Sequence, residues 1–157
     1  MSSIYVNNKY RIKRSANQQE MMQKLMAGNK LFESYRDILV LSAAIGYANN
    51  AYKPITKAAS DGVLMQFFTE QDWDYIDLIA YAHTKEQAVL HTDMKYEIFS
   101  AYANGGFSIL MELLEIDEAT EIDDLTQETK LLKICELMIT GNVLAPSVED
   151  DVFIKND

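Results

Sequence analysis

The sequence predicts a mainly α-helical protein, a compact bundle of about five to six helices that leaves open a short strand or hairpin near the N-terminus. Apolar residues recur at helical spacing in several segments, and capping residues precede these segments. The 157 residues and 48% apolar content fit one packed domain. We expect a single helical domain over residues 1–142 and an acidic, flexible tail over residues 143–157.

The N-terminal segment combines an extended stretch with a first helix. Residues 4–14 alternate loosely between apolar and polar, which fits a short strand or an extended arm. Ser15 then predicts a helix start with Gln18 as its capping-box partner, and Gly28-Asn29 predicts the end. The apolar stripe of this helix consists of Met21, Met22, Leu25 and Met26.

A second helix is predicted to begin at Ser34, with Asp37 in its first turn, where the helix dipole favours an acid. From Ile38 to Tyr47 it is apolar nearly all round, which predicts a central buried helix. The short apolar run from Val63 to Phe68 fits either a strand or a helix.

Two further helices are predicted in the middle of the chain, one from about Asp72 and one from Thr92 or Asp93. The inner face of the first holds Trp73, Ile76, Ile79 and Ala80. Gly105-Gly106 interrupts the second, at a cost of about 2 kcal/mol relative to two alanines. Either the helix breaks there, or another backbone packs too closely for any Cβ.

A last helix is expected after the acidic stretch, with Thr126 as its cap. Its buried side is predicted to hold Leu131, Leu132, Cys135, Met138 and Ile139. Cys135 is the single cysteine, so an internal disulfide is excluded and a reducing cytoplasm is favoured. The longest apolar-leaning stretch is about half of a membrane span, so no membrane insertion is expected.

Charge is distributed unevenly along the chain. The net formal charge is +5 over residues 1–36, −5 over residues 37–111 and −10 over residues 112–157. A chain with a net charge of −10 does not bind nucleic acid through its bulk charge. The acidic end favours solubility, and the alternatives are that it holds the basic N-terminal segment in cis, repels DNA or docks on a basic partner.

No pattern in the sequence predicts catalytic chemistry, a metal or a cofactor. His83 and His91 are eight residues apart, which is not a ligand spacing, and Cys135 has no histidine near it in the sequence. Paired carboxylates such as Asp72/Asp74 are interpreted as solvated faces. We therefore expect no enzyme. The alternative is a site assembled from scattered polar residues, namely His83, His91, Asp93 and Tyr96.

The N-terminal basic residues are the candidates for nucleic-acid contact. They are Lys9, Arg11, Lys13 and Arg14. A strand would place the first three on one face, where they could follow phosphates. The competing interpretation is a solvated edge strand, because lysines commonly protect such edges. About four charges predict only weak, salt-sensitive binding.

Three segments in order resemble a known family: residues 32–47, residues 77–80 and residues 102–107. Together with the basic opening at residues 10–14, they are similar to DNA phosphorothioation-associated protein 4, also called Dnd system-associated protein 4. The resemblance covers roughly residues 10–114. The motif positions, expected to be structural, are Tyr35, Asp37, Gly46, Tyr102, Asn104, Gly105 and Gly106.

This resemblance implies a bacterial accessory protein of a DNA phosphorothioation-linked modification and restriction system, which defends against phage. It implies no catalytic residue and no cofactor. We expect an adaptor whose partners are other proteins of the same system. The alternative is a small DNA-contacting regulator that uses the basic N-terminal segment.

Overall fold

The computed structural model describes residues 5–27, 31–116 and 124–139, and the chain there is mainly α-helical, as predicted. The expected tail over residues 143–157 and the expected helix end at Gly28-Asn29 lie outside the described residues. Within the described residues, no helix is long and apolar enough to cross a membrane.

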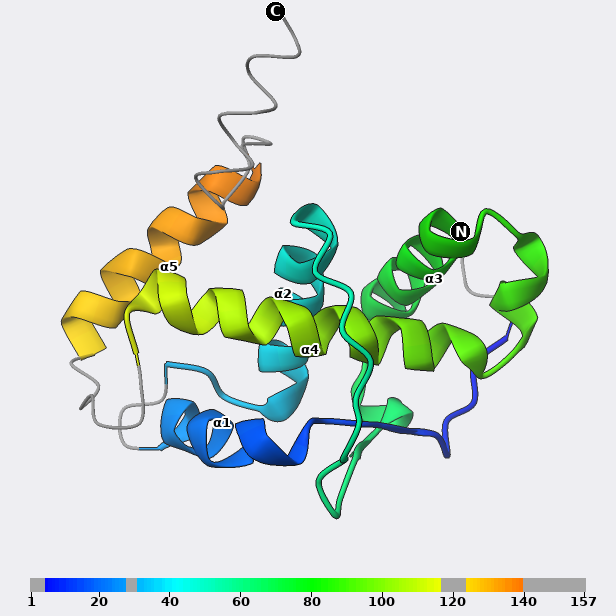
Figure 1. Cartoon of the computed structure of the whole chain (residues 1–157), viewed down its shortest axis with the longest axis horizontal. Coiled ribbons are helices and arrows are strands. Elements are labelled where there is room, and N and C mark those ends of the chain that lie inside the picture. The colour runs from blue at the N-terminus through cyan, green and yellow to red at the C-terminus, as the bar shows by residue number, and fades with distance from the viewer. Residues whose placement is uncertain (1–4, 28–30, 117–123, 140–157) are drawn as a thin grey trace, which may run out of the picture.

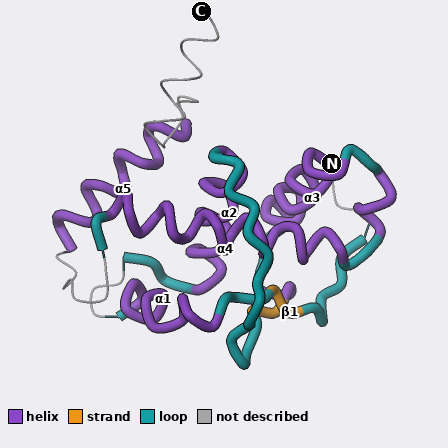
Figure 2. The backbone as a smooth tube through the Cα atoms, in the orientation of Figure 1, coloured by secondary structure: helices purple, strands orange, loops and turns teal. Residues whose placement is uncertain are grey.

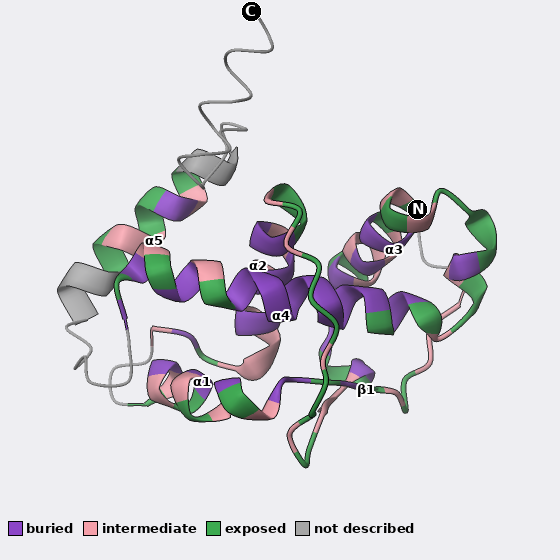
Figure 3. Cartoon of the chain, viewed as in Figure 1, coloured by how far each residue is buried: buried purple, intermediate pink, exposed green. Residues whose placement is uncertain are grey.

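Helix α4 (Met94–Leu114) is the centre of the molecule, and the other helices pack around it (Figure 1). Most of its length is buried (Figure 3). The sequence assigned this place to α2 (Tyr35–Ala48), and that prediction is wrong in part. Ile38 and Ile45 are buried, but Tyr47 is 39% exposed, because α2 packs one face against α4 and leaves the other outside.

The crossing of α2 and α4 is made by glycines whose backbones touch. A Cβ on Gly46 would lie 2.0 Å from the carbonyl oxygen of Tyr102, and one on Gly106 would lie 1.7 Å from that of Ser42. Helix α4 runs unbroken through this point. Of the two alternatives for the glycine pair, close packing is correct and a break in the helix is wrong.

The loop after α2 crosses the same region of α4 (Figure 1). The Lys53 amide donates to the carbonyl of Ala101 at 3.1 Å, and Asn104 Nδ2 donates to the carbonyl of Lys53 at 2.8 Å. A Cβ on Gly105 would lie 1.9 Å from the carbonyl oxygen of Ala51. The two glycines therefore make room for two different segments.

The N-terminal segment forms a short strand, β1 (Arg11–Ile12), which pairs antiparallel with β2 (Val63–Leu64) (Figure 2). An isolated bridge between Ser15 and Ala58 extends this pairing. The ambiguous run from Val63 to Phe68 thus begins as a strand and continues as the 3-10 turn η2 (Met65–Phe67).

Helix α1 (Gln19–Met26) follows the 3-10 turn η1 (Ala16–Gln18), so the predicted capping box at Ser15 is wrong. The Ser15 hydroxyl bonds to Asn17 Oδ1 at 2.8 Å and caps no amide. From the predicted stripe, Met22 and Leu25 are buried and the other two methionines are half-buried.

Helix α3 (Glu70–Thr84) begins two residues before the predicted start. Thr69 and Asp72 form a capping box in which each side chain accepts from the other residue's amide. Ile76 and Ile79 are buried, as predicted. Asp72 is buried as well, which corrects its interpretation as part of a solvated face. The 3-10 turn η3 (Gln87–His91) leads into α4.

A buried ion pair joins α3 to α4. Lys95 on α4 is almost fully buried, and its Nζ lies 2.9 Å from Asp77 Oδ1 on α3. The same ammonium donates to the carbonyls of Leu90 and Tyr5. This charge therefore holds α3, η3 and the N-terminal segment against α4.

Helix α5 (Asp124–Ile139) begins before Thr126, so that residue does not cap it. Ile134 is buried, Cys135 is half-buried and Leu132 is 71% exposed, which corrects the predicted inner face. Apolar residues lie on more than one side of this helix, and its contact with α4 selects the side that is buried. The side chains of Met138 and Ile139 lie outside the described part.

Candidate functional site at the start of helix α2

An open hollow of about 610 Å³ lies where the N-terminus of α2 meets the loop that leads into β2. We call it the α2 hollow. Its lining consists of Arg14, Met26, residues 33–37, residues 61–63 and Phe67. Segments far apart in the sequence therefore form one concave surface of the size that ligand sites occupy.

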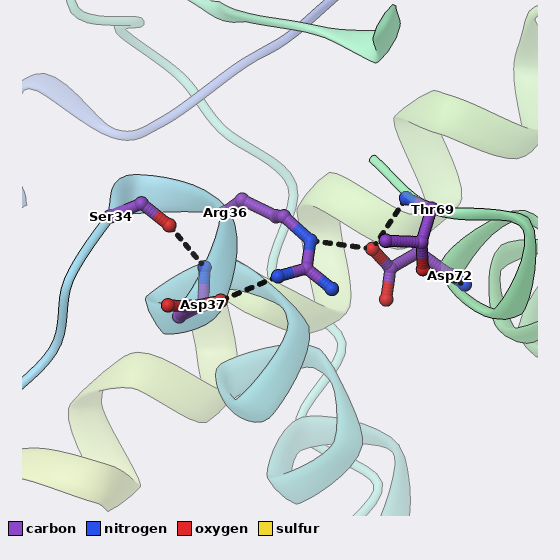
Figure 4. Close-up of polar contacts among 5 residues, drawn as sticks. All are labelled: Ser34, Arg36, Asp37, Thr69 and Asp72. Carbon is purple, nitrogen blue, oxygen red and sulfur yellow. Dashed lines mark hydrogen bonds and ion pairs between the residues drawn. The ribbon is translucent and has the colours of Figure 1, made fainter. Parts of the chain in front are cut away.

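The first turn of α2 forms one wall of the hollow. Ser34 has an extended backbone and its hydroxyl accepts from the Asp37 amide at 3.2 Å, as the sequence predicts for an N-cap. Figure 4 shows this cap beside the side chain of Arg36. The cap fixes where the helix begins and so fixes the direction in which Arg36 leaves it.

Arg36 joins the starts of α2 and α3 (Figure 4). Its Nε donates to Asp72 Oδ2 at 2.6 Å, and its Nη1 donates to Asp37 Oδ1 at 2.7 Å. The same Asp72 oxygen accepts from the Thr69 amide at 2.9 Å. The hydrogen bond to Asp72 is the main reason that the pKa of Arg36 is raised. The guanidinium is thus a fixed cation held by two carboxylates.

Arg14 forms the floor of the hollow and is buried. Its Nη1 donates to the carbonyl of Asp61 at 2.8 Å, and its Nη2 donates to Asp61 Oδ1 and Gln19 Oε1, both at 3.1 Å. The guanidinium carbon lies 4.0 Å from the ring centroid of Tyr35. Its Nε is also buried and has no hydrogen-bond partner in the described part of the chain.

Of the four basic residues singled out from the sequence, Lys9, Arg11 and Lys13 are exposed and Arg14 is buried. Lys13 Nζ lies 3.0 Å from Glu97 Oε1 on α4. Arg11 Nη1 donates to the carbonyl of Gly62 at 3.3 Å. The regular strand β1 covers only Arg11 and Ile12 of the stretch for which a shared face of Lys9, Arg11 and Lys13 was predicted.

The rim of the hollow is apolar and acidic. Phe67 is 62% exposed, Asp61 has a side chain that is 65% exposed, and Glu33 is exposed. The sequence did not single out these three residues. Phe67 belonged to the ambiguous apolar run, while the spacing of Thr69 and Asp72 carried a capping-box signal that could have been found.

The polar residues of the alternative enzyme site separate into two groups. His83 Nδ1 lies 2.8 Å from the Tyr102 hydroxyl, and the His83 ring stacks on Tyr52 with 4.4 Å between centroids. Asp93 Oδ1 instead accepts from the hydroxyl of Tyr5 at 2.7 Å. His91 is exposed.

Tyr96 belongs with Asp93. Its hydroxyl accepts from the Asn7 amide at 2.9 Å, and Asn7 Nδ2 donates to Asp93. Burial raises the pKa of Tyr96. Both residues thus hold the N-terminal segment on α4. No group of three or more His, Cys, Asp or Glu side chains within residues 5–27, 31–116 and 124–139 is placed to hold a metal ion.

The positions that carry the family resemblance lie in two places. Tyr35 and Asp37 belong to the α2 hollow. The others surround the crossing of α2 and α4, where the carbonyl of Asn104 also accepts from Gln18 Nε2 at 3.1 Å. This second group consists of Gly46, Tyr102, Asn104, Gly105 and Gly106.

These features define a small, mainly helical protein that presents an open hollow, lined by charged and apolar side chains, beside the joined starts of two helices. The family model of DNA sulphur modification system-associated protein 4 matches residues 11–132. The chain belongs to this family, which confirms the resemblance, and the family name associates its members with a DNA sulphur modification system. No curated protein and no solved structure matches the chain.

Proposed function

We propose that this protein is a non-enzymatic, cytoplasmic adaptor of a DNA sulphur modification system. In this role it contacts other proteins of a modification and restriction system that defends against phage. Its docking surface is the α2 hollow. The observation that carries the proposal is an exposed aromatic side chain, Phe67, on the rim of an open hollow in a chain of a system-associated family.

The state of the polar groups around the hollow supports binding over bond-making chemistry. Arg36 donates to both Asp37 and Asp72, and Arg14 donates to Asp61. A catalytic acid or base must be able to exchange a proton with the substrate, and a nucleophile needs an adjacent base that removes its proton. Groups held in ion pairs within the fold instead form an ordered wall, which suits a docking surface.

Co-purification tests the adaptor role. The tagged protein is expressed together with the modification and restriction proteins of its own system, and we expect at least one of them to be retained. Phe67→Ser should lower the retained amount several-fold, because a side chain that is 62% exposed here would become buried in the complex.

The matched control is Leu78→Ser on α3. Leu78 is 65% exposed and does not line the hollow, so its replacement should leave retention unchanged. If no protein of the system is retained under conditions in which those proteins bind one another, the adaptor role is wrong. Unchanged retention of Phe67→Ser would place the docking surface elsewhere, and equal loss from both variants would show that the effect of Phe67→Ser is not specific to the hollow.

DNA contact through the N-terminal segment is the second candidate, supported by the exposed positions of Lys9 and Arg11. Changing both to glutamine should then abolish a mobility shift of duplex DNA at low salt. Lys13 is exposed too but is paired with Glu97, so the two cations without an ion pair among the described residues predict a shallow salt dependence, with a slope of about −2. Absence of any shift by the unchanged protein at low salt would eliminate this candidate.

A further inference from the structure

We propose that the α2 hollow accepts one arginine or lysine side chain from a basic segment of its protein partner. This inference rests on the proposed adaptor function and specifies the chemistry of the partner. It follows from which hydrogen-bonding groups of the hollow are already used, from its apolar rim and from the charge of the chain.

Most of the charged donors that line the hollow take part in internal bonds, and in the described part of the chain Arg36 Nη2 is the one guanidinium nitrogen of the two lining arginines that stays open to a ligand. Both Nη atoms of Arg14 donate hydrogen bonds to Asp61 or Gln19, and its Nε is buried. Arg36 donates from Nε to Asp72 and from Nη1 to Asp37. Each arginine is held by an ion pair, and the paired carboxylates Asp61, Asp37 and Asp72 offset the two positive charges.

The acceptors, by contrast, remain available at the rim. Glu33 is exposed and forms no ion pair with a described residue. Asp61 gives Oδ1 to Arg14, and its side chain is 65% exposed. A surface that offers acceptors and negative charge fits a ligand with several donors and a positive charge, which describes a guanidinium or an ammonium.

The apolar part of the rim fits the stem of such a side chain. Phe67 is exposed, and Met26 and Val63, which also line the hollow, are half-buried. Arginine and lysine bury their methylene groups along apolar surface while the charged end stays polar. A cation near the face of a phenylalanine ring is attracted to it electrostatically as well.

An anion is a poorer occupant, although a helix N-terminus by itself would favour one. The Asp37 amide already bonds to Ser34, and the Asp37 carboxylate lies in the same first turn. Glu33 and Asp61 add negative charge to the rim. A DNA phosphate would be repelled by these carboxylates, so the hollow does not fit the DNA backbone.

Size and net charge favour a protein segment over a free small cation. About 610 Å³ exceeds what one side chain fills, so part of the partner's backbone can enter with it. The chain carries a formal net charge of −10, which attracts a basic surface over a distance and accelerates encounter.

A peptide titration followed by amide chemical shifts of the full chain tests the proposal. The probe is a blocked pentapeptide with a central arginine between leucine and glycine residues. The matched peptide carries citrulline, which keeps the shape of arginine but not its charge. We expect saturable shifts at Glu33, Asp61 and Phe67, and binding at least about tenfold weaker for citrulline, because the charge is lost.

Variants locate the site. Glu33→Gln should raise the Kd of the arginine peptide about two- to fivefold, the range for one exposed ion pair. Glu20→Gln, an exposed acid on α1 away from the hollow, should leave it unchanged. Raising the salt concentration should weaken the arginine peptide and not the citrulline peptide.

The proposal is overturned if both peptides bind equally, if the shifts lie outside the hollow, or if no shift appears up to the solubility limit of the peptide. These results leave the adaptor function intact when a protein of the system still co-purifies and Phe67→Ser still reduces its retention. Failure of co-purification, with the arginine shifts present, would instead remove the adaptor function and keep the cation site.

Discussion

Gly106 lies where the absence of a side chain lets the backbones of α2 and α4 touch. Its backbone lies so close to α2 that a Cβ would be 1.7 Å from the carbonyl oxygen of Ser42, and that atom is backbone, which cannot rotate away. An alanine would normally favour a helix by up to about 1 kcal/mol. Here the helix preference and the packing requirement oppose each other, and the overlap is far too large for the preference to prevail.

Gly106→Ala should therefore lower the free energy of unfolding by about 3 kcal/mol, because α2 and α4 must separate to admit the methyl group. Urea denaturation measures this change. Ser108→Ala, at an exposed position of the same helix, should change stability by less than about 0.5 kcal/mol. A stabilised Gly106→Ala variant would contradict the close crossing.

Glu97 makes a pH-dependent contribution to the stability of the fold. Burial alone would raise its pKa, but hydrogen bonds from Tyr10 and Lys13 bring the pKa below the usual 4.5. A lowered pKa in the folded state means that the carboxylate stabilises the fold above the unfolded value. That contribution is lost as the pH falls through the folded value.

Glu97→Gln should thus be less stable than the unchanged protein at neutral pH, with a difference that shrinks below about pH 4. Urea denaturation across this pH range measures it. Tyr10→Phe removes one of the two bonds and should show a smaller loss of the same sign. A difference that is constant with pH would show that the Glu97 charge has no part in it.

At the scale of elements, helices α2 and α3 are connected at their starts. Each begins with a hydroxyl cap, Ser34 and Thr69, and Arg36 bridges the acids that belong to these caps (Figure 4). Asp72 takes part in both devices, since it closes the capping box of α3 and accepts from Arg36. The wall of the α2 hollow is rigid because these local caps share one ion-pair network.

Asp72→Ala should cost about 2 kcal/mol of unfolding free energy. About 1 kcal/mol comes from the capping box, and the rest from Arg36, which keeps Asp37 as its remaining carboxylate partner. Thermal denaturation and a double-mutant cycle with Arg36→Met separate the two parts. Asp74 lies two residues further along α3 and forms no ion pair in the described part of the chain, so Asp74→Ala should have little effect.

At the scale of the whole molecule, stability should be graded outward from α4. Amides at the crossing of α2 and α4 should exchange with solvent slowest, because their opening requires global unfolding. Helix α5 should exchange faster: of its side chains at positions 128–136, only Ile134 is buried. Hydrogen exchange measured by mass spectrometry tests this order, and equal protection of α5 and α4 would contradict it.

Local signals in the sequence were reliable where a few neighbouring residues decide the outcome. The cap at Ser34 with Asp37, the start of α4 after Asp93 and the buried face of α3 all follow from short-range rules, and the structure confirms them. The capping box predicted at Ser15 was wrong because the serine hydroxyl bonds to the Asn17 side chain in place of a backbone amide.

The candidate site was less predictable, because its residues meet only through tertiary contacts. Arg14 reads as one more exposed cation in a basic run, yet Asp61, Gln19 and Tyr35 enclose it. Asp72 reads as a solvated acid until Arg36 is brought beside it from another helix. Sequence spacing carries no information on either meeting.

By itself, the sequence determined the helical class, the positions of most helices and the family, because periodicity, caps and motifs are written along the chain. Only the tertiary structure decided that α4 lies at the centre and that Gly46 and Gly106 bring two backbones together. It also decided which charged side chains form ion pairs within the fold and which face solvent. The physical reason is that burial and pairing depend on segments distant in sequence, whose mutual approach is set by packing of the whole core.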